Sequence, residues 1–422
     1  MPGVERPLRI AYLVYRGNPH CGGQGVYTRY LARELSALGH QVTVFSGPPY
    51  PELDDPDQLV RVPSLDLYRP GNPFRVPWPW EFRDTADLRE FGIMCAAGFP
   101  EPFAFSLRAR RLLAGRRGDF DLVHDNQCLG SGLLGMIDDG WPVLATLHHP
   151  ITVDRDLDLA HATGPWRRLT LHRWYGFLDM QMRVAQRIPR LVTVSRSSRR
   201  DIVAQMGVPA ERLHIVPVGV DPSTFRPLDH VARVPGRIMT TASSDVPMKG
   251  VAPLLEAVAK VRTERDDVHL VVIGKPKDKS RIPALIERFG LRDAVRFVSG
   301  VSTERIVELY GEAELAVVPS LYEGFSLPAI EAMACGVPLV ATTGGALPEV
   351  VGTHGETGLL VPPNDPSALA AMILRALGDR ELRSRVGEAG RKRVLERFTW
   401  RATAEGTVEQ YRALLEDGSP PC

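Results

Sequence analysis

Short runs of apolar residues alternate with longer stretches of helical periodicity along most of this chain. Most of the runs are continuously apolar, which is typical of strands buried on both faces of a parallel sheet. The alternation predicts repeated strand–helix–strand units with right-handed crossovers, and therefore an α/β fold. The expected strands span residues 8–15, 41–46, 122–125, 143–148, 191–195 and 214–218, and then 237–241, 269–274, 295–298, 315–319, 339–342 and 358–361.

A segment rich in proline and aspartate interrupts the alternation near the middle of the chain. The stretch VGVDPSTFRPLD (218–229) shows no long hydrophobic period, and a new strand–loop–helix unit begins directly after it. The chain has 422 residues, which is long for one hydrophobic core. We predict two doubly wound, Rossmann-like domains facing each other across a cleft, at 1–220 and 221–399. The last helix (400–416) is a candidate to pack back on the first domain.

Prolines and aromatic residues crowd residues 48–105, where the alternation fails. A loop of this length is usually either functional or disordered. Two interpretations remain open. The region is either a surface excursion packed by its own aromatic side chains, or a lid or insertion that binds an acceptor molecule.

The composition is that of an ordinary soluble globular protein, with 44% hydrophobic and 24% charged residues. A formal net charge of +1 argues against an extended nucleic-acid surface. The five cysteines are scattered and form no CxxC pair, which argues against a disulfide framework or a zinc site. No secretory signal pattern begins the chain, and no apolar run is long enough to cross a membrane. We therefore expect a cytoplasmic protein without a metal site.

The first candidate site is a glycine loop that follows the first expected strand. In GGQGVYTRYLARELSALGH, Gly22, Gly23 and Gly25 precede a helix that begins near Val26. Glycines let backbone N–H groups approach a ligand closely, and a helix N-terminus favours an anion. The spacing is not GxGxxG, which disfavours a dinucleotide-binding fold. A simple tight turn would explain these glycines equally well.

The second candidate lies after the first strand of the second half. In SSDVPMKGVAPLLEAVAKV, Lys249 and Gly250 stand at the start of an amphipathic helix. A lysine there can place its ammonium group beside a phosphate at the helix N-terminus. The alternative is a solvated lysine on a loop.

The third and strongest candidate is EGFSLPAIEAMACGVPLVATTGGALPEVV. We expect Ser326 to cap a helix over 327–335, with Glu323 just before it and Glu331 inside it. The free N–H groups at the start of this helix favour an anion, which would then have a carboxylate on either side. Carboxylates accept hydrogen bonds well from vicinal hydroxyls, so the arrangement suits a sugar nucleotide.

At these motifs the chain resembles the family 4 retaining glycosyltransferases of the GT-B fold. The resemblance spans nearly the whole chain and rests on Gly22–Gly23, Lys249–Gly250 and Glu323-x7-Glu331. The runs Thr343–Gly345, Pro348–Glu349 and Gly358–Asp365 also fit the family. The resemblance implies a nucleotide-diphosphate-sugar donor, an unidentified glycan, lipid or small-molecule acceptor, and no further cofactor.

The resemblance also implies roles for residues on the donor side. Glu331 would hold the ribose hydroxyls, and Glu323 would contact the transferred sugar. Backbone amides of Phe325, Ser326 and Leu327 would face the pyrophosphate.

The remaining implied roles concern the phosphates and the acceptor. Lys249 would neutralise the phosphates, and Gly22 and Gly23 would approach them from the other domain. His148, in ATLHHP, would lie near the sugar and the acceptor, although its neighbour His149 could take that place. Without the resemblance, a buried structural histidine would be the simpler interpretation of His148.

One position departs from the family pattern. Many members carry an arginine beside the phosphates six residues before the lysine, and this chain has Ser243 there. Either Ser243, Ser244 or Asp245 must serve instead, or a basic residue such as Lys275 or Lys277 compensates. The departure raises the question of how the leaving phosphate is stabilised.

The predicted activity is the metal-independent, retaining transfer of a sugar, with Lys249 and the helix N-terminus stabilising the leaving diphosphate. Two alternatives share these features: a GT-B phosphorylase that uses inorganic phosphate, and a non-catalytic nucleotide-sugar-binding protein. A hydrolase with paired catalytic carboxylates is disfavoured because Glu323 and Glu331 both belong to the donor side.

A basic and aromatic stretch, Trp166–Arg190, adds a question about membranes. A helix of this composition can dock on anionic lipid, here at the inner face of a membrane. The alternative is a helix packed on the sheet of the first domain with a solvated basic face.

Overall fold

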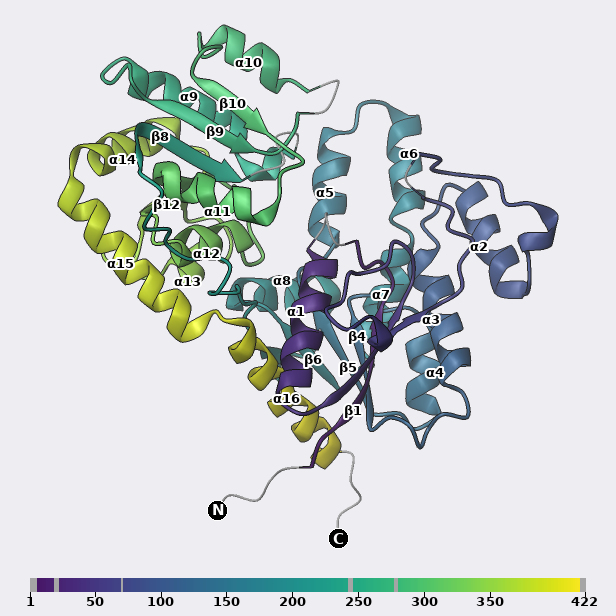
Figure 1. The fold of residues 1–422 in the computed structure, drawn as a ribbon. Helices are drawn as coiled ribbons and strands as arrows, with labels where there is room; N and C mark the ends of the chain where they lie inside the picture. The colour runs from purple at the N-terminus through teal and green to yellow at the C-terminus, as the bar shows by residue number, and fades with distance from the viewer. Residues whose placement is uncertain (1–5, 19–22, 70, 242–245, 277–279, 418–422) are drawn as a thin grey trace. The chain divides into compact units, whose positions relative to one another are not determined.

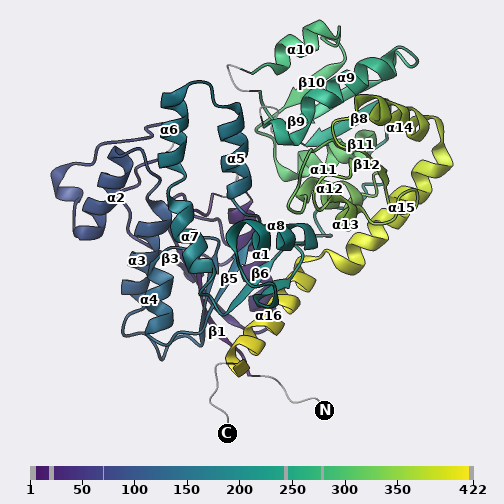
Figure 2. The same cartoon turned by 180° about the vertical axis from the view of Figure 1, so that it is seen from behind.

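The structure is a computed structural model that describes residues 6–18, 23–69, 71–241, 246–276 and 280–417. The chain divides into two compact units. The first contains residues up to 194, residues 198–216 and those from 403 onward, and the second contains 195–197 and 217–402. Figure 1 and the reverse view in Figure 2 show that each unit consists of a sheet flanked by helices.

A seven-stranded sheet forms the centre of the first unit, in the order β3-β2-β1-β4-β5-β6-β7. Its neighbouring strands are all parallel. The order reverses between β1 and β4, so this unit is doubly wound. The strands are β1 (Arg9–Val14), β2 (Gln41–Ser46), β3 (Leu59–Arg61), β4 (Leu122–Asn126), β5 (Val143–Leu147), β6 (Arg190–Thr193) and β7 (Leu213–Ile215).

Helices cover both faces of the first sheet. One face packs against α3, α4, α7 and α8 through a buried cluster that includes Phe105, Met136, Val184 and Met206. The opposite face receives Tyr411 from α16. The helices are α1 (Gln24–Ala37), α2 (Thr85–Cys95), α3 (Glu101–Leu113), α4 (Gly132–Asp138), α5 (Thr152–His161), α6 (Pro165–Trp174), α7 (Phe177–Ala185), α8 (Arg196–Met206) and α16 (Trp400–Asp417), of which α16 begins in the second unit.

The second unit contains a six-stranded sheet in the order β10-β9-β8-β11-β12-β13, again with parallel neighbours. The order reverses between β8 and β11. The strands are β8 (Val234–Thr241), β9 (His269–Ile273), β10 (Val295–Val298), β11 (Ala313–Val318), β12 (Leu339–Thr342) and β13 (Leu359–Val361).

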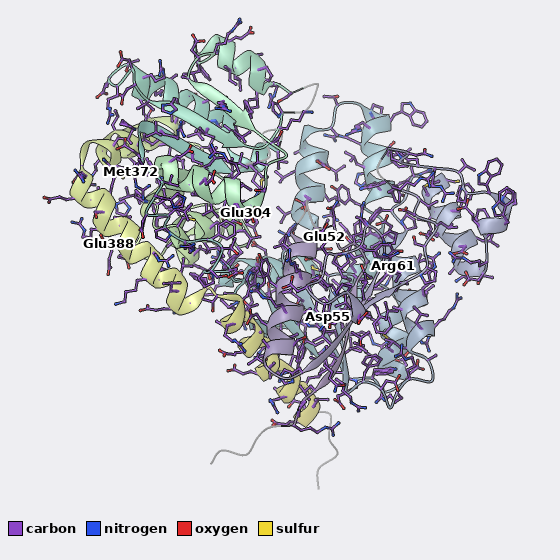
Figure 3. The ribbon with its side chains drawn as sticks, in the orientation of Figure 1. Glu52, Asp55, Arg61, Glu304, Met372 and Glu388 are labelled. Atoms are coloured by element: carbon purple, nitrogen blue, oxygen red, sulfur yellow. The ribbon has the colours of Figure 1, made fainter. Side chains whose placement is uncertain are left out.

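Helices α9, α10 and α14 pack on one face of this sheet around a buried cluster that includes Leu254, Val272 and Ile373. On the outer helix α15, Val386 is buried and Glu388 is exposed (Figure 3). The helices are α9 (Val251–Arg262), α10 (Ile282–Arg288), α11 (Thr303–Glu312), α12 (Leu327–Ala334), α13 (Leu347–Val351), α14 (Pro366–Gly378) and α15 (Arg380–Arg397).

Every strand expected from the sequence is present to within a few residues, and the doubly wound α/β class is confirmed. Within 48–105, however, the expectation of irregular chain is wrong, because β3 and α2 both lie there. Strand β3 is too short to give a hydrophobic run. Helix α2 did carry a start signal, since the Asp84 carboxylate accepts hydrogen bonds from the N–H groups of Ala86 and Asp87.

A buried hydrogen-bonded histidine joins α16 to the first sheet. The Nδ1 of His124 lies 2.6 Å from the Tyr411 hydroxyl, and its Nε2 lies 2.7 Å from the Thr146 hydroxyl. None of the three side chains reaches solvent. Burial lowers the pKa of His124 to about 3, so the ring is neutral at physiological pH.

We expect Tyr411→Phe to destabilise the first unit by about 1–3 kcal/mol, because it leaves a buried ring nitrogen of His124 without its partner. Urea unfolding of the full chain measures this loss, with Tyr50→Phe at a partly exposed tyrosine as the control. An unfolding midpoint equal to that of the wild type would contradict the assignment.

Candidate functional site

The carboxyl ends of β8 and β11 meet where the strand order of the second sheet reverses. In open α/β sheets such a switch point is where ligands bind. The chain leaving β8 leads to Lys249, and the chain leaving β11 leads to Glu323. The fold therefore brings together two residues that lie 74 positions apart in the sequence.

Close backbone approaches fix the loop that follows β11. A Cβ atom on Gly250 would lie 1.9 Å from the carbonyl oxygen of Pro319, and one on Gly345 would lie 2.3 Å from that of Glu323. Both glycines also have left-handed φ angles, 65° and 62°. The Glu323 carbonyl accepts a hydrogen bond of 2.8 Å from the N–H of Ala346. Only glycine fits at these two positions without displacing the loop.

Lys249 and Glu323 form an ion pair. The Lys249 Nζ lies 2.8 Å and 3.0 Å from the two carboxylate oxygens. The Ser320 hydroxyl donates to the same carboxylate at 2.6 Å. Glu323 is 9% exposed. The ammonium group has three donors and the carboxylate has further lone pairs, so each can also bind a ligand.

Ser326, just before α12, has a strained backbone and a buried hydroxyl. Its φ of 107° is unusual for a residue other than glycine. The expected side-chain cap is wrong, because the Ser326 side chain makes no capping hydrogen bond. Its Oγ is buried and has no hydrogen-bond partner within the described residues. Strain and an unsatisfied buried polar atom of this kind are typical of ligand-binding sites.

Helix α12 itself runs over Leu327–Ala334, close to the expected 327–335. Pro328 is tolerated in its first turn, and Gly336 follows its end with a left-handed φ of 67°. The N–H groups at its start, including that of Leu327, have no acceptor within the helix. The ring of Phe325 is buried 5.6 Å from that of Phe398, which leaves its main chain as the group available to a ligand.

Glu331 lies in the fifth position of α12, beside the Tyr310 hydroxyl. That hydroxyl donates to the Pro328 carbonyl at 3.4 Å and lies 3.1 Å from the hydroxyl of Thr241, at the end of β8. Hydrogen bonding by Tyr310 also favours the ionised form of Glu331. Burial raises the pKa of Glu331 to about 7, and the bond to Tyr310 opposes that rise only partly. A buried carboxyl group whose pKa is raised in this way is a candidate for binding a ligand.

In the first unit, His148 follows β5 and lies beside residues at the carboxyl end of β4. Its Nε2 is 2.8 Å from the Asn126 side-chain oxygen, and its backbone N–H donates to the Gln127 side-chain oxygen at 2.8 Å. The rings of Tyr27 and His148 pack edge to face, with their centroids 4.6 Å apart. Burial lowers the pKa of His148 to about 3, so the ring is neutral and, with Nε2–H donating to Asn126, Nδ1 is an acceptor.

His149 lies in a different environment from His148. Its Nε2 is 2.9 Å from a carboxylate oxygen of Asp154, and both side chains are exposed. Of the two adjacent histidines, only His148 directs its side chain to the polar group at the carboxyl ends of β4 and β5, whereas His149 contributes its carbonyl, which accepts a hydrogen bond of 3.0 Å from the Gln127 side chain.

Two of the predicted site residues, Gly22 and Ser243, lie outside the described residues. Gly23 is described: it precedes α1 with a left-handed φ of 76°, and α1 begins at Gln24, slightly earlier than expected. Among the described residues, none has an atom within 4 Å of the position that a Cβ of Gly23 would take.

Sequence reasoning missed several residues that shape these groups. Asn126 and Gln127 stand at the end of an expected strand, and that position was a signal available in the sequence. Ser320 likewise follows β11. Tyr310, by contrast, lies in α11 far from any motif, and no local pattern indicates its contact with Glu331.

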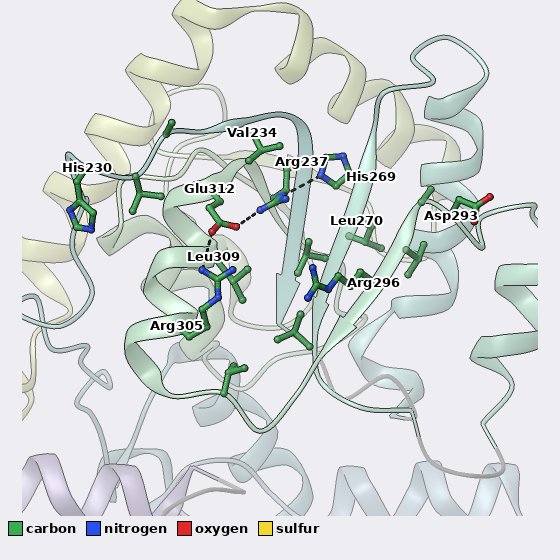
Figure 4. A pocket seen from close by; sticks show the side chains of 17 residues that line it. His230, Val234, Arg237, His269, Leu270, Asp293, Arg296, Arg305, Leu309 and Glu312 are labelled. Atoms are coloured by element: carbon green, nitrogen blue, oxygen red, sulfur yellow. Dashed lines mark hydrogen bonds and ion pairs between the residues drawn. The ribbon is translucent and has the colours of Figure 1, made fainter.

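A groove of about 810 Å³ in the second unit does not coincide with these residues. It lies along β8, β9, β10 and α11, and Figure 4 shows Glu312 there between Arg237 and Arg305. Arg305 lies 2.9 Å from one oxygen of Glu312, whose other oxygen binds Arg237. His269 is the first residue of β9 and Arg237 pairs with it in the first half of β8, whereas ligands of this fold class bind at the carboxyl ends of the strands. We therefore place the candidate site at Lys249, Glu323 and α12.

In the part of the chain that the structure describes, no three His, Cys, Asp or Glu side chains lie together so that they could hold a metal ion.

Comparison with known proteins adds an independent line of information. Residues 21–224 match the family described as Glycosyltransferase Family 4, and residues 229–393 match Glycosyl transferases group 1. An MMP alpha-(1->4)-mannosyltransferase from Mycolicibacterium hassiacum is 54% identical over 410 residues, 97% of this chain and 98% of that protein. A D-inositol 3-phosphate glycosyltransferase from Acidothermus cellulolyticus is 30% identical over 97% of this chain and 91% of its own length.

Solved structures agree in fold. A sucrose-phosphate synthase from Thermosynechococcus elongatus superposes with a TM-score of 0.74 at 25% identity, covering 98% of this chain and all of the other.

The raised pKa of Glu331 predicts a pH-dependent stability. Its folded value is about 7 and its ordinary value is 4.5, so its contribution is fully present below pH 4.5 and is lost as the pH rises through 7. The total loss is about 3 kcal/mol. We expect Glu331→Gln to remove this dependence, so that the unfolding free energy of the variant rises relative to the wild type between pH 5 and pH 8.

Urea unfolding at the two pH values measures that difference. Glu388→Gln, at an exposed glutamate, is the matched control and should track the wild type. If Glu331→Gln also tracks the wild type at both pH values, the carboxyl group does not have the raised pKa.

Proposed function

Because the chain belongs to glycosyltransferase family 4, we propose that it transfers mannose from a nucleoside-diphosphate donor to an acceptor, with retention at the anomeric carbon and without a metal ion. Glycosyl transfer follows from the family. Mannose as the sugar and an α-(1→4) product are supported by the 54% identity to a mannosyltransferase along nearly the whole chain. The alternatives, a phosphorylase and a non-catalytic binding protein, gain no supporting observation.

The observation that carries this proposal is the start of α12. The Ser326 hydroxyl is buried and has no partner in the described ranges of the chain, and the first N–H groups of α12 lack acceptors within the helix. A diphosphate would satisfy both, because phosphate oxygens accept hydrogen bonds and the positive end of the helix dipole attracts their charge.

Lys249 would stabilise the departing diphosphate. As the bond to the sugar breaks, negative charge develops on the phosphate oxygens, and a positioned ammonium group stabilises that charge more than it stabilises the bound donor. In the structure the Lys249 charge is balanced by Glu323 at 2.8 Å. Glu323 thereby holds the ammonium group in position and keeps lone pairs for the hydroxyls of the transferred sugar.

Glu331 would accept hydrogen bonds from the ribose hydroxyls, with Tyr310 orienting its carboxylate. His148 would act in the first unit. With its ring neutral, Nδ1 can accept a hydrogen bond from a sugar or acceptor hydroxyl without placing a second positive charge near the forming cationic sugar.

Turnover of the purified full chain tests the proposal. We expect mannose transfer from GDP-mannose to α-(1→4)-linked mannose oligosaccharides, an α-linked product by NMR, and no loss of rate with EDTA. Lys249→Ala should lower kcat by about 10²–10³-fold, the usual effect of removing a group that stabilises transition-state charge. Lys260→Ala, at an exposed lysine on α9, is the control.

Three outcomes would overturn parts of this proposal. A β-linked product would refute retention, and loss of activity in EDTA would refute metal independence. A Lys249→Ala enzyme as active as Lys260→Ala would show that the diphosphate binds elsewhere.

We also propose that the enzyme works in the cytoplasm, in peripheral contact with the inner face of a membrane. The stretch 166–190 forms two helices rather than one. Helix α7 buries Leu178 and Val184 in the core, whereas α6 exposes Trp166 (80%) and Leu169 (43%) beside Arg167 and Arg168. An exposed basic and aromatic helix of this kind suits anionic lipid. No helix in the described ranges is long and apolar enough to cross a bilayer.

Flotation with vesicles containing an anionic phospholipid tests this contact. We expect the full chain to float, and Arg167→Glu with Arg168→Glu to lower the bound fraction severalfold, because each basic residue near the surface adds about 1 kcal/mol. The matched control reverses Arg385 and Lys392 on α15. Failure of the wild type to float, or equal losses in both variants, would remove the membrane proposal.

A further inference from the structure

A second pocket, of about 600 Å³, lies in the first unit among α2, α3, α6 and α7. It contains neither His148 nor any other residue assigned a role above. Its volume falls within the range of about 300–1,000 Å³ that is usual for small-molecule sites. Its wall combines an apolar interior with a basic rim, formed by Phe99, Phe103, Phe177, Met180, Arg173 and Arg183.

The interior of the pocket is built from aromatic rings that are fixed in place. The rings of Phe99 and Phe177 lie 5.3 Å apart at 64°. Phe99 is also 5.1 Å from the ring of Trp174 and 5.5 Å from that of Tyr68, whose hydroxyl donates to the Gly98 carbonyl at 3.3 Å. Phe103, Phe177 and Met180 are only partly buried, so apolar surface is open to a ligand. A hydrocarbon chain placed there would gain about 25 cal/mol for each Å² removed from water.

The charged side chains on the rim of the pocket are all positive. Arg173 and Arg183 are both exposed, and neither has a hydrogen-bond or ion-pair partner among the described residues. By contrast, the neighbouring Arg187 pairs with Asp138 at 3.3 Å. None of the described residues that line the pocket carries a carboxylate. Guanidinium groups bind phosphate and carboxylate with paired hydrogen bonds, so this rim suits an anion.

We propose that this pocket binds an anionic amphiphile, with its hydrocarbon chain among Phe99, Phe103, Phe177 and Met180 and its phosphate or carboxylate at Arg173 and Arg183. The amphiphile is either the apolar end of a lipid-linked acceptor or a separate effector molecule; both sources share this chemistry. The proposal does not depend on the sugar or the linkage proposed above.

Isothermal titration of the full chain with decyl phosphate, kept below its micelle-forming concentration, tests the proposal. We expect saturable binding of one molecule, and binding at least tenfold weaker for decanol, which lacks the anion. Inorganic phosphate, which lacks the chain, should not compete. Arg183→Gln should weaken binding about tenfold, whereas the matched control Arg187→Gln should stay within about twofold of the wild type.

Ala96→Trp supplies a second variant that leaves the core intact. Ala96 is an exposed residue at the end of α2 that lines the pocket, so a tryptophan there fills the space without removing buried contacts. We expect it to abolish decyl phosphate binding while leaving the unfolding midpoint unchanged.

Two turnover measurements distinguish the sources. A decyl glycoside acceptor whose KM is lower than that of the free sugar, with the difference lost in Ala96→Trp, indicates an acceptor tail. A change in kcat on adding decyl phosphate, also lost in Ala96→Trp, indicates an effector.

The proposal is overturned if decyl phosphate does not bind. It is equally overturned if Ala96→Trp binds as tightly as the wild type, or if Arg187→Gln loses as much affinity as Arg183→Gln.

Discussion

The backbone of the loop after β11 is held at distances that leave no space for side chains. Gly250 lies against the Pro319 carbonyl and Gly345 against that of Glu323, so three separate chain segments converge on a few main-chain atoms. This convergence sets where the Glu323 carboxylate points, how far Lys249 reaches and where α12 begins. The energetic cost appears at Ser326, whose strained backbone and unpaired hydroxyl persist because the surrounding contacts determine the loop.

Both units place their polar groups at the carboxyl ends of parallel strands. In the second unit a lysine and two glutamates follow β8 and β11, the strands on either side of the reversal in strand order. In the first unit a histidine, an asparagine and a glutamine gather at the ends of β4 and β5, of which only β4 borders the reversal. Charge therefore gathers in the second unit, and the first unit offers neutral hydrogen-bonding groups around His148.

The sequence predicted the sheets well because strands buried on both faces are apolar throughout. It predicted the order of motifs around Glu323 for a similar reason, since Pro328 and Gly336 bound a helix by their own backbone preferences. It failed where the deciding contact is not local. Three contacts depend on which segments the sheets bring together in space. These are the ion pair of Lys249 with Glu323, the contact of Tyr310 with Glu331, and the hydrogen bond of His148 with Asn126. The capping role expected of Ser326 failed because the close contacts around its loop override the usual preference of serine before a helix.

The last helix has a consequence for how the protein is made. Helix α16 starts in the second unit, yet from residue 403 onward it belongs to the first, where Tyr411 completes the hydrogen bonds of His124. During synthesis the first unit emerges from the ribosome early, with the part of its sheet around His124 not yet covered by α16. It must wait in that incomplete state until the whole second unit has been translated, and this part of the sheet is open to chaperones or to aggregation throughout that interval.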